Sequence, residues 1–223
     1  MKDIVESFQI TYNNDAVYDI IADVGDVTLD AIMNGGALDG VPVLGLIKGI
    51  YKGTQHIQMR RLMEKVYKFL FLSKDTTFKE RQEFMDEYTE RNREEGCEAL
   101  LTLLDRLDNT HKVNIIVNLM KAKMNGDITI DDFIRLCVIV ERIPFSDFKE
   151  LPKYTDDFYE AGASDMLLSA GVLNNTVIGA GDYNRYRLNS LGVQLLRYGL
   201  SYDVAVEVKL STHLAALEWQ EIK

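Results

Sequence analysis

The segment from Lys121 to Asp132 has the length and part of the spacing of a calcium-binding loop. Gly126 falls at the sixth position and Asp132 at the twelfth, as in that motif. Lys121 and Lys123 would occupy the first and third positions, where oxygen ligands are required. The segment is therefore predicted to join two helices and to bind no calcium.

Other patterns that support chemistry are also missing from the sequence. His56, His111 and His213 have no second histidine or cysteine at the spacing of a zinc site. The chain contains no nucleophile elbow and no Walker loop, and the glycine pair 179–181 fits a hairpin turn. The many carboxylates are interpreted as solvated helix ends. We therefore predict no catalytic residue, no metal and no cofactor, and a protein that is not an enzyme.

Composition bounds the cellular setting and the partners. Cys97 and Cys137 each lie in a helical pattern, and are predicted to be reduced thiols in the core of a cytoplasmic protein. The sequence begins without the basic and apolar regions of a signal peptide, and no run approaches the ~20 apolar residues of a membrane span. The formal net charge of −10 disfavours nucleic acid as a partner.

Three apolar stripes follow one another between Glu98 and Ile143, each with the spacing of one helix face. Asp108 and Asn109 are predicted to cap the second helix, Gly126 to end it, and Thr129 to cap the third. Because each helix must bury its apolar face, the three are expected to form a core on which the rest packs. The stripes are Leu100, Leu103, Leu104 and Leu107; Val113, Ile116, Val117 and Met120; and Ile130, Phe133, Ile134 and Cys137.

Glycines recur every four residues on a helix predicted to begin at Pro42. One face of this helix would carry no side chains, although each interior glycine costs about 1 kcal/mol relative to alanine. One interpretation is tight packing against a neighbouring helix of the core. The alternative is a surface that contacts a partner, a second copy or a membrane. The candidate contact residues are Val43, Gly45, Leu46, Lys48, Gly49, Lys52 and Gly53.

Further helices are predicted over residues 16–33, 56–72 and 78–93, and a linker over 152–157. The helix over 56–72 carries Arg60, Arg61, Lys65 and Lys68, interpreted as a solvated face or as a contact for an anionic lipid or acidic partner. The expected fold is mainly α, a helical bundle followed by a small α+β module. The predicted divisions are an N-terminal helical arm (1–35), the bundle (36–152) and the module (153–223).

The last part of the chain is predicted to run helix, hairpin, helix. The stretches MLLSAGVL and YRLNSLGVQLL resemble the end of a winged-helix module over about forty residues. That resemblance implies a nucleic-acid contact through Arg185, Arg187 and Arg197. Because the approach to the expected reading helix is acidic, with Asp156, Asp157, Glu160 and Asp165, docking of a protein is favoured over DNA reading.

The middle of the chain, roughly residues 37–150, resembles a set of uncharacterised helical proteins of bacteria and phages. The likeness lies in LDGVPVLGLIKGIYKGTQHIQMRRLMEKVYKFL, LLTLLDRLDNTHKV and NGDITIDDFIRL, and the last loop is also similar to helical domains of the tellurite-resistance type. The resemblance implies a role in conflict between bacteria and phages, and it supplies no catalytic residues.

Three functions follow as hypotheses. The first is a non-enzymatic interaction or regulatory protein that docks a protein partner, or a second copy, through the module or the acidic face of the bundle. The second is a membrane-associated effector that acts through residues 41–53. The third is a nucleic-acid-binding regulator that uses the three arginines of the module.

Overall fold

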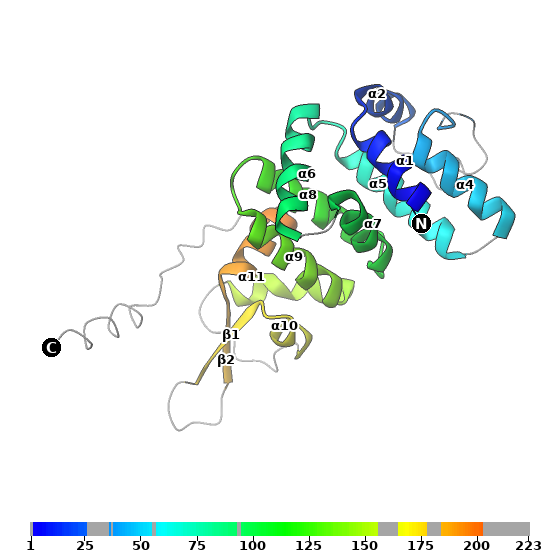
Figure 1. Cartoon of the computed structure of the whole chain (residues 1–223). Coiled ribbons are helices and arrows are strands. Elements are labelled where there is room, and N and C mark those ends of the chain that lie inside the picture. Colours follow the sequence, from blue (N-terminus) through cyan, green and yellow to red (C-terminus); the bar gives the residue numbers. More distant parts are fainter. Residues whose placement is uncertain are drawn as a thin grey trace.

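The structure of the chain, a computed structural model, describes residues 2–25, 36, 38–54, 57–92, 95–155, 165–177 and 184–202 (Figure 1). It is mainly helical with one small antiparallel sheet, which confirms the predicted class at that level. The first helices are α1 (Lys2–Tyr12), α2 (Asp15–Val24), α4 (Pro42–Thr54), α5 (Ile57–Leu72), α6 (Phe78–Asn92), α7 (Gly96–Arg106), α8 (Lys112–Met124) and α9 (Ile130–Arg142). There follow the 3-10 helix η1 (Phe145–Tyr154), α10 (Asp165–Ser169), strands β1 (Leu173–Val177) and β2 (Asn184–Leu188), α11 (Ser190–Gln194) and the π-helical turn η2 (Leu195–Gly199).

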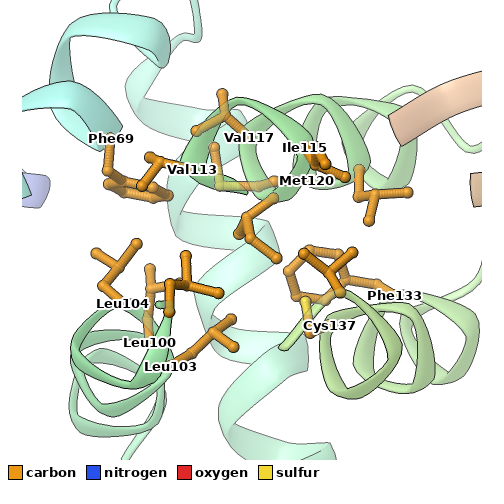
Figure 2. Close-up of a cluster of buried hydrophobic side chains, with 14 of the residues drawn as sticks. Phe69, Leu100, Leu103, Leu104, Val113, Ile115, Val117, Met120, Phe133 and Cys137 are labelled. Atoms are coloured by element: carbon orange, nitrogen blue, oxygen red, sulfur yellow. The ribbon is translucent and has the colours of Figure 1, made fainter. Parts of the chain in front are cut away.

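Helix α8 lies at the centre and is covered on several sides. Figure 2 shows its side chains meeting those of α5, α7 and α9 in one apolar cluster. The predicted stripes of all three helices lie largely in this core. On the opposite face of α8, Ile115 and Leu119 are also buried, because η2 packs against them. The sequence pattern predicted one apolar face for α8, and the structure buries almost its whole circumference.

Two of the predicted capping residues, Gly126 and Thr129, lie at helix ends as expected. The Thr129 hydroxyl accepts a hydrogen bond from the backbone N–H of Asp132 at 3.1 Å, and Gly126 takes a left-handed φ of 81° after α8. The predicted start of α8 is wrong by a few residues. Asn109 accepts from the N–H of His111 at 2.8 Å and forms a turn, and the helix begins at Lys112.

Arg81 on α6 is fully buried and joins α6 to the first two helices. Its guanidinium donates to the backbone carbonyl of Tyr12 at 3.0 Å, to that of Thr76, and to the carboxylate of Asp15. It also lies 4.0 Å from the centre of the Tyr18 ring, in a cation–π contact. The chain turns that follow α1 and α5 are thus held by one side chain.

Two buried lysines also donate hydrogen bonds to backbone carbonyls near helix ends. The ammonium of Lys65 donates to the carbonyl of Asp105, near the end of α7, at 2.8 Å. The ammonium of Lys112 lies 2.6 Å from the carboxylate of Asp108 and 3.1 Å from the carbonyl of Glu141, near the end of α9. Carbonyls of the last helical turn have no partner within their own helix, so a buried cation there stabilises the helix end.

The C-terminal part of the described chain forms the predicted hairpin with shifted strands. β1 and β2 are antiparallel, and Leu173 pairs with Leu188. Residues 174–175 belong to β1, which begins at the buried Leu173. The side-chain oxygen of Asn189 caps α11 by accepting a hydrogen bond from the backbone N–H of Gly192 at 2.9 Å.

The first residues of the predicted linker are helical in the structure. Residues 152–154 belong to η1, with Leu151 and Tyr154 buried against the body of the protein. Residues 156–157 of that linker lie outside the described part, as do the segment 26–35, the helix expected to continue through it, and the strand and helix expected after residue 202. Side chains from α1 to η2 belong to one apolar cluster, and the domain boundaries at 35 and 152 stay predictions.

Replacing Arg81 by methionine is expected to lower the free energy of unfolding by about 2–4 kcal/mol, because the carbonyl of Tyr12 and that of Thr76 lose their donor inside the protein. Urea unfolding followed by circular dichroism measures the change. The control is Lys79→Met on the same helix, whose side chain is 81% exposed and whose loss should change stability by less than about 0.5 kcal/mol. Equal stabilities of the two variants would contradict the role given to Arg81.

Candidate interaction surface

Helix α4 is fixed by its inner side, which packs on α1 and α5. Val43, Leu44 and Ile47 are buried, with Val43 and Ile47 completely inaccessible. The buried hydroxyl of Thr11 on α1 accepts a hydrogen bond from the backbone N–H of Val43 at 3.2 Å. That bond satisfies an N–H of the first helical turn, which has no partner within the helix itself. The prediction that Val43 is a contact residue is therefore wrong, because its side chain serves the core.

The outer side of α4 carries the glycines. Gly45 and Gly49 are exposed, and a Cβ atom built on either one would have no atom within 4 Å. The interpretation that these glycines allow tight packing within the chain is therefore wrong. The surroundings of Gly53 lie outside the part that the structure describes. At Gly45 and Gly49 the helix offers bare backbone to the outside.

The remaining candidate residues of α4 differ in how far their side chains are exposed. Leu46 is half-buried. The ammonium of Lys48 lies 3.1 Å from the carboxylate of Asp39, and this lysine side chain is only 16% exposed. Lys52 is exposed, and at seven residues from Gly45 it lies on the same helix face. Lys52 is thus the more exposed of the two cations of α4.

The start of α5 adds charge and an apolar side chain to the same end of the molecule. Arg60 and Arg61 are exposed, and Ile57 is 70% exposed. Figure 1 shows α4 and α5 side by side at the end of the protein opposite the β1–β2 hairpin. We call this set the α4–α5 surface: Gly45, Gly49, Lys52, Ile57, Arg60 and Arg61. Sequence reasoning found its glycines, its lysine and its arginines and missed Ile57, because a single apolar residue at a helix start carries no signal of exposure.

The arginines of the C-terminal part lie on two different elements. Arg185 and Arg187 are two residues apart on β2, so their positions share one face of the hairpin, opposite the face that buries Tyr186 and Leu188. Arg197 is exposed on η2, which packs against α8. The contact predicted for these three residues stays a prediction.

A second charged surface lies on α6, where glutamates line two clefts. One cleft has a volume of about 290 Å³ and is lined by Glu83 and Glu87 together with Lys123 of α8. The other, of about 570 Å³, is lined by Glu87, Glu90 and the ion pair of Arg91 with Asp131. We call Glu83, Glu87 and Glu90 the α6 acidic face. Their spacing places them on one side of the helix.

Both cysteine thiols have an altered proton affinity because they lie in the core. Burial raises the pKa of the Cys97 thiol to about 12, and it raises the pKa of Cys137 further. Both cysteines are buried and free, as predicted. Because a thiol reacts as the thiolate, neither is suited to nucleophilic chemistry at neutral pH. Among the residues that the structure describes, no three histidine, cysteine or carboxylate side chains are grouped to hold a metal ion.

Comparisons with known proteins add no relative. Searches against protein families, curated proteins and solved structures return no match to this chain. None of the helices in the described ranges has the length and apolar character needed to cross a bilayer. The geometry of the α4–α5 surface is therefore the basis on which a function is argued.

Replacing Gly45 or Gly49 by alanine is expected to raise the free energy of unfolding by about 0.5–1 kcal/mol each, because alanine favours the helix and meets no neighbour. The matched control is Gly192→Ala, whose Cβ would lie 2.3 Å from the carbonyl oxygen of Val172 and should destabilise the protein. Thermal and urea unfolding measure both. Destabilisation by Gly45→Ala would show that the space beside α4 is occupied.

Proposed function

We propose that the protein is a non-enzymatic interaction protein that associates with a second copy of itself, the α4–α5 surface of one chain meeting the α6 acidic face of the other. The observation that carries this proposal is the exposed cationic end on a strongly acidic chain. Residues 42–68 hold six basic residues and one acidic residue, whereas the whole chain has a net charge of −10. Of these six, Lys52, Arg60 and Arg61 are exposed.

Charge complementarity supports a second copy of the chain as the partner of the α4–α5 surface. An uneven charge distribution orients two molecules before contact and raises the rate at which opposite surfaces meet. The carboxylates of the α6 acidic face are exposed: Glu83 is 67% exposed and pairs with Lys79, and Glu87 is 45% exposed and pairs with Lys123. The clefts beside Glu87 and Glu90 give room for long basic side chains to enter.

The bare backbone of α4 favours a helix as the element of the second copy that packs against it. Gly45, Gly49 and Lys52 share one helix face, so a second helix can approach that face closely while its charges meet Lys52. Glu83 and Glu90 are seven residues apart on one side of α6, which is two helical turns. Two turns of α4 separate Gly45 from Lys52, so the two helix faces have matching lengths.

The strength expected of such a contact is modest. Exposed ion pairs contribute about 0.2–1 kcal/mol each and are screened by salt. Ile57 and Leu46 supply the apolar surface, and they are few. We expect a dissociation constant on the order of 0.1 mM at low ionic strength, equivalent to about −5.5 kcal/mol. Because the two surfaces differ, the contact runs head to tail and can extend beyond a dimer.

The test is a charge swap followed by analytical ultracentrifugation at low and at high salt. One variant carries Lys52→Glu and Arg61→Glu, and the other carries Glu83→Lys and Glu90→Lys. We expect the unaltered chain to associate at low salt, each variant alone to associate less, and an equimolar mixture of the two to form a complex. The Gly45→Ala, Gly49→Ala double variant should be more stable and associate less, because its two methyl groups hold the helices apart.

The control is Arg197→Ala, which removes an exposed arginine from a different surface and should associate as the unaltered chain does. A strictly monomeric chain at low salt, or a mixture of swap variants that stays dissociated, would contradict the proposal. A separate experiment mixes the chain with vesicles that contain anionic lipid. Sedimentation of a monomeric chain with these vesicles, lost on reversal of Lys52 and Arg61, would replace the second copy by a membrane.

The expected roles in conflict with phages and in winged-helix docking stay predictions. They rest on resemblances in the sequence, and the order α10, β1, β2, α11 supports the second of them. The proposed association does not depend on either, because it uses α4, α5 and α6 alone.

A further inference from the structure

The outer face of α9 carries two arginines on either side of a valine. Arg135, Val138 and Arg142 follow one another at steps of three and four residues, so they share one face of the helix. Both arginines are exposed, and Val138 is 42% exposed. Within the part of the chain that the structure describes, neither guanidinium takes part in a hydrogen bond or an ion pair. These two cations are therefore available to a second molecule.

The carboxylates of α9 are already engaged or lie to the side of this face. Asp131 is paired with Arg91 of α6. Asp132 accepts a hydrogen bond from the side-chain amide of Gln194 at 3.4 Å. Glu141 is half-buried on the flank of the helix, one turn from a cysteine of the core. The positive charge of the two arginines is thus not cancelled by a carboxylate of their own helix.

The apolar part of this face continues past the end of α9. Phe145, the first residue of η1, is 40% exposed and stacks on the ring of His111, with ring centroids 5.3 Å apart. The inner side of the helix holds the face outward, because Phe133, Leu136 and Val140 are completely buried. We call Arg135, Val138, Arg142 and Phe145 the α9 face.

The first two helices form a surface of the opposite charge. Residues 2–25 contain five acidic residues and one basic residue, and of the acidic ones Asp15 is paired with Arg81. The other four carboxylates are exposed and have no ion pair among the residues that the structure describes: Asp3, Glu6, Asp19 and Asp23. Ile10 on α1 is 53% exposed. We call Asp3, Glu6 and Ile10 the α1 face, because their spacing places them on one side of the helix.

The two faces have the same spacing. The members of the α1 face lie at steps of three and four residues, as the first three members of the α9 face do. We place the two helices antiparallel, with Ile10 against Val138. Glu6 and Arg142 then meet, because each lies four residues, or about 6 Å, from the apolar residue of its own helix. Arg135 lies opposite the end of α1, where α2 begins and adds its carboxylates.

We propose that the α9 face of one copy packs against the α1 face of a second copy. Within one molecule α7 packs against both α1 and α9, and Figure 1 shows these two helices apart from each other. The two faces are thus separated within a chain and free to meet between copies. This contact adds to the self-association proposed above, and it uses no residue of the α4–α5 surface or the α6 acidic face. Each contact can therefore be removed without altering the other.

Charge and spacing together favour a second copy as the partner. A guanidinium pairs with a carboxylate through two parallel hydrogen bonds, and the α1 face offers carboxylates beside an exposed apolar residue. A nucleic-acid backbone would also pair with the two arginines. It would offer nothing apolar to cover Val138 and Phe145, whereas Ile10 covers Val138 in the arrangement proposed.

The experiment is carried out in a chain whose first contact is removed. This background chain carries Lys52→Glu and Arg61→Glu, which reverse the charge of the α4–α5 surface. Its association is measured by analytical ultracentrifugation at low ionic strength, where exposed charges are least screened. We expect the background chain to associate still, through the α9 face and the α1 face.

Two further variants of the background chain reverse one face each. The first adds Arg135→Glu and Arg142→Glu, and the second adds Asp3→Lys and Glu6→Lys. Each variant alone then carries like charges on both faces, and we expect its association constant to fall at least about tenfold. In an equimolar mixture the acidic faces of the first meet the basic faces of the second, so a complex is expected to form again.

Matched controls separate this contact from a general effect of charge or of apolar surface. Lys79→Glu with Arg197→Glu changes the net charge by the same amount on other elements, and should leave the association of the background chain unchanged. Ile10→Ser should weaken that association, whereas Ile57→Ser, at a residue that is 70% exposed on α5, should not. Circular dichroism confirms that each variant is folded.

The inference is overturned if the background chain sediments as a monomer, or if the mixture of reversed variants stays dissociated. It is also overturned if the control pair weakens association as much as the reversal of Arg135 and Arg142 does. Vesicles of phosphatidylcholine and phosphatidylserine that bind a monomeric chain through these two arginines would assign the face to a membrane instead. Loss of this contact alone, with association through Lys52 and Arg61 retained, would leave the proposed function standing.

Discussion

Helix α8 is apolar around most of its circumference, and the protein must surround it to keep it from water. A helix with one apolar face needs one partner, whereas a helix that is apolar on all sides must lie inside the protein. The covering comes from α5, α6 and α9 on several sides and from η2 on another. A segment more than seventy residues away in the sequence is thus required to complete the core. This is the reason that the end of the described chain returns to its middle.

The burial of three long cations follows from the same crowding. Arg81, Lys65 and Lys112 each donate to at least one backbone carbonyl near a helix end or turn. Helices packed around a central one bring their ends into the interior, where the last carbonyls find no water. Each buried cation donates to one or two such carbonyls, and the cost of its desolvation is offset by these bonds and by nearby carboxylates. Burial lowers the pKa of Lys65, which is the sign of that cost.

The sequence predicted the helices well and their environment less well. Periodicity and caps placed α5, α6, α7, α8 and α9 within a few residues, because these signals are local. Burial of Ile115 and Leu119 could not be predicted, because it depends on η2 arriving from elsewhere. The same holds for a cavity of about 320 Å³ that is lined by residues of both α8 and η2. Asn174 and Asn175 have the residue types of a turn, yet their strand is set by Leu173 pairing with Leu188.

Packing within the folded chain explains some of its glycines and does not explain others. At Gly96, Gly192 and Gly199 an added Cβ would come within 3 Å of another atom, so packing explains these residues. At Gly45 and Gly49 an added Cβ meets nothing, and alanine would make a better helix. The folded chain itself therefore gives no reason for a glycine at either position. Both lie on the face of α4 that also carries Lys52, at the cationic end of an acidic protein. Bare backbone and positive charge on one helix face are the two features on which the proposed association rests.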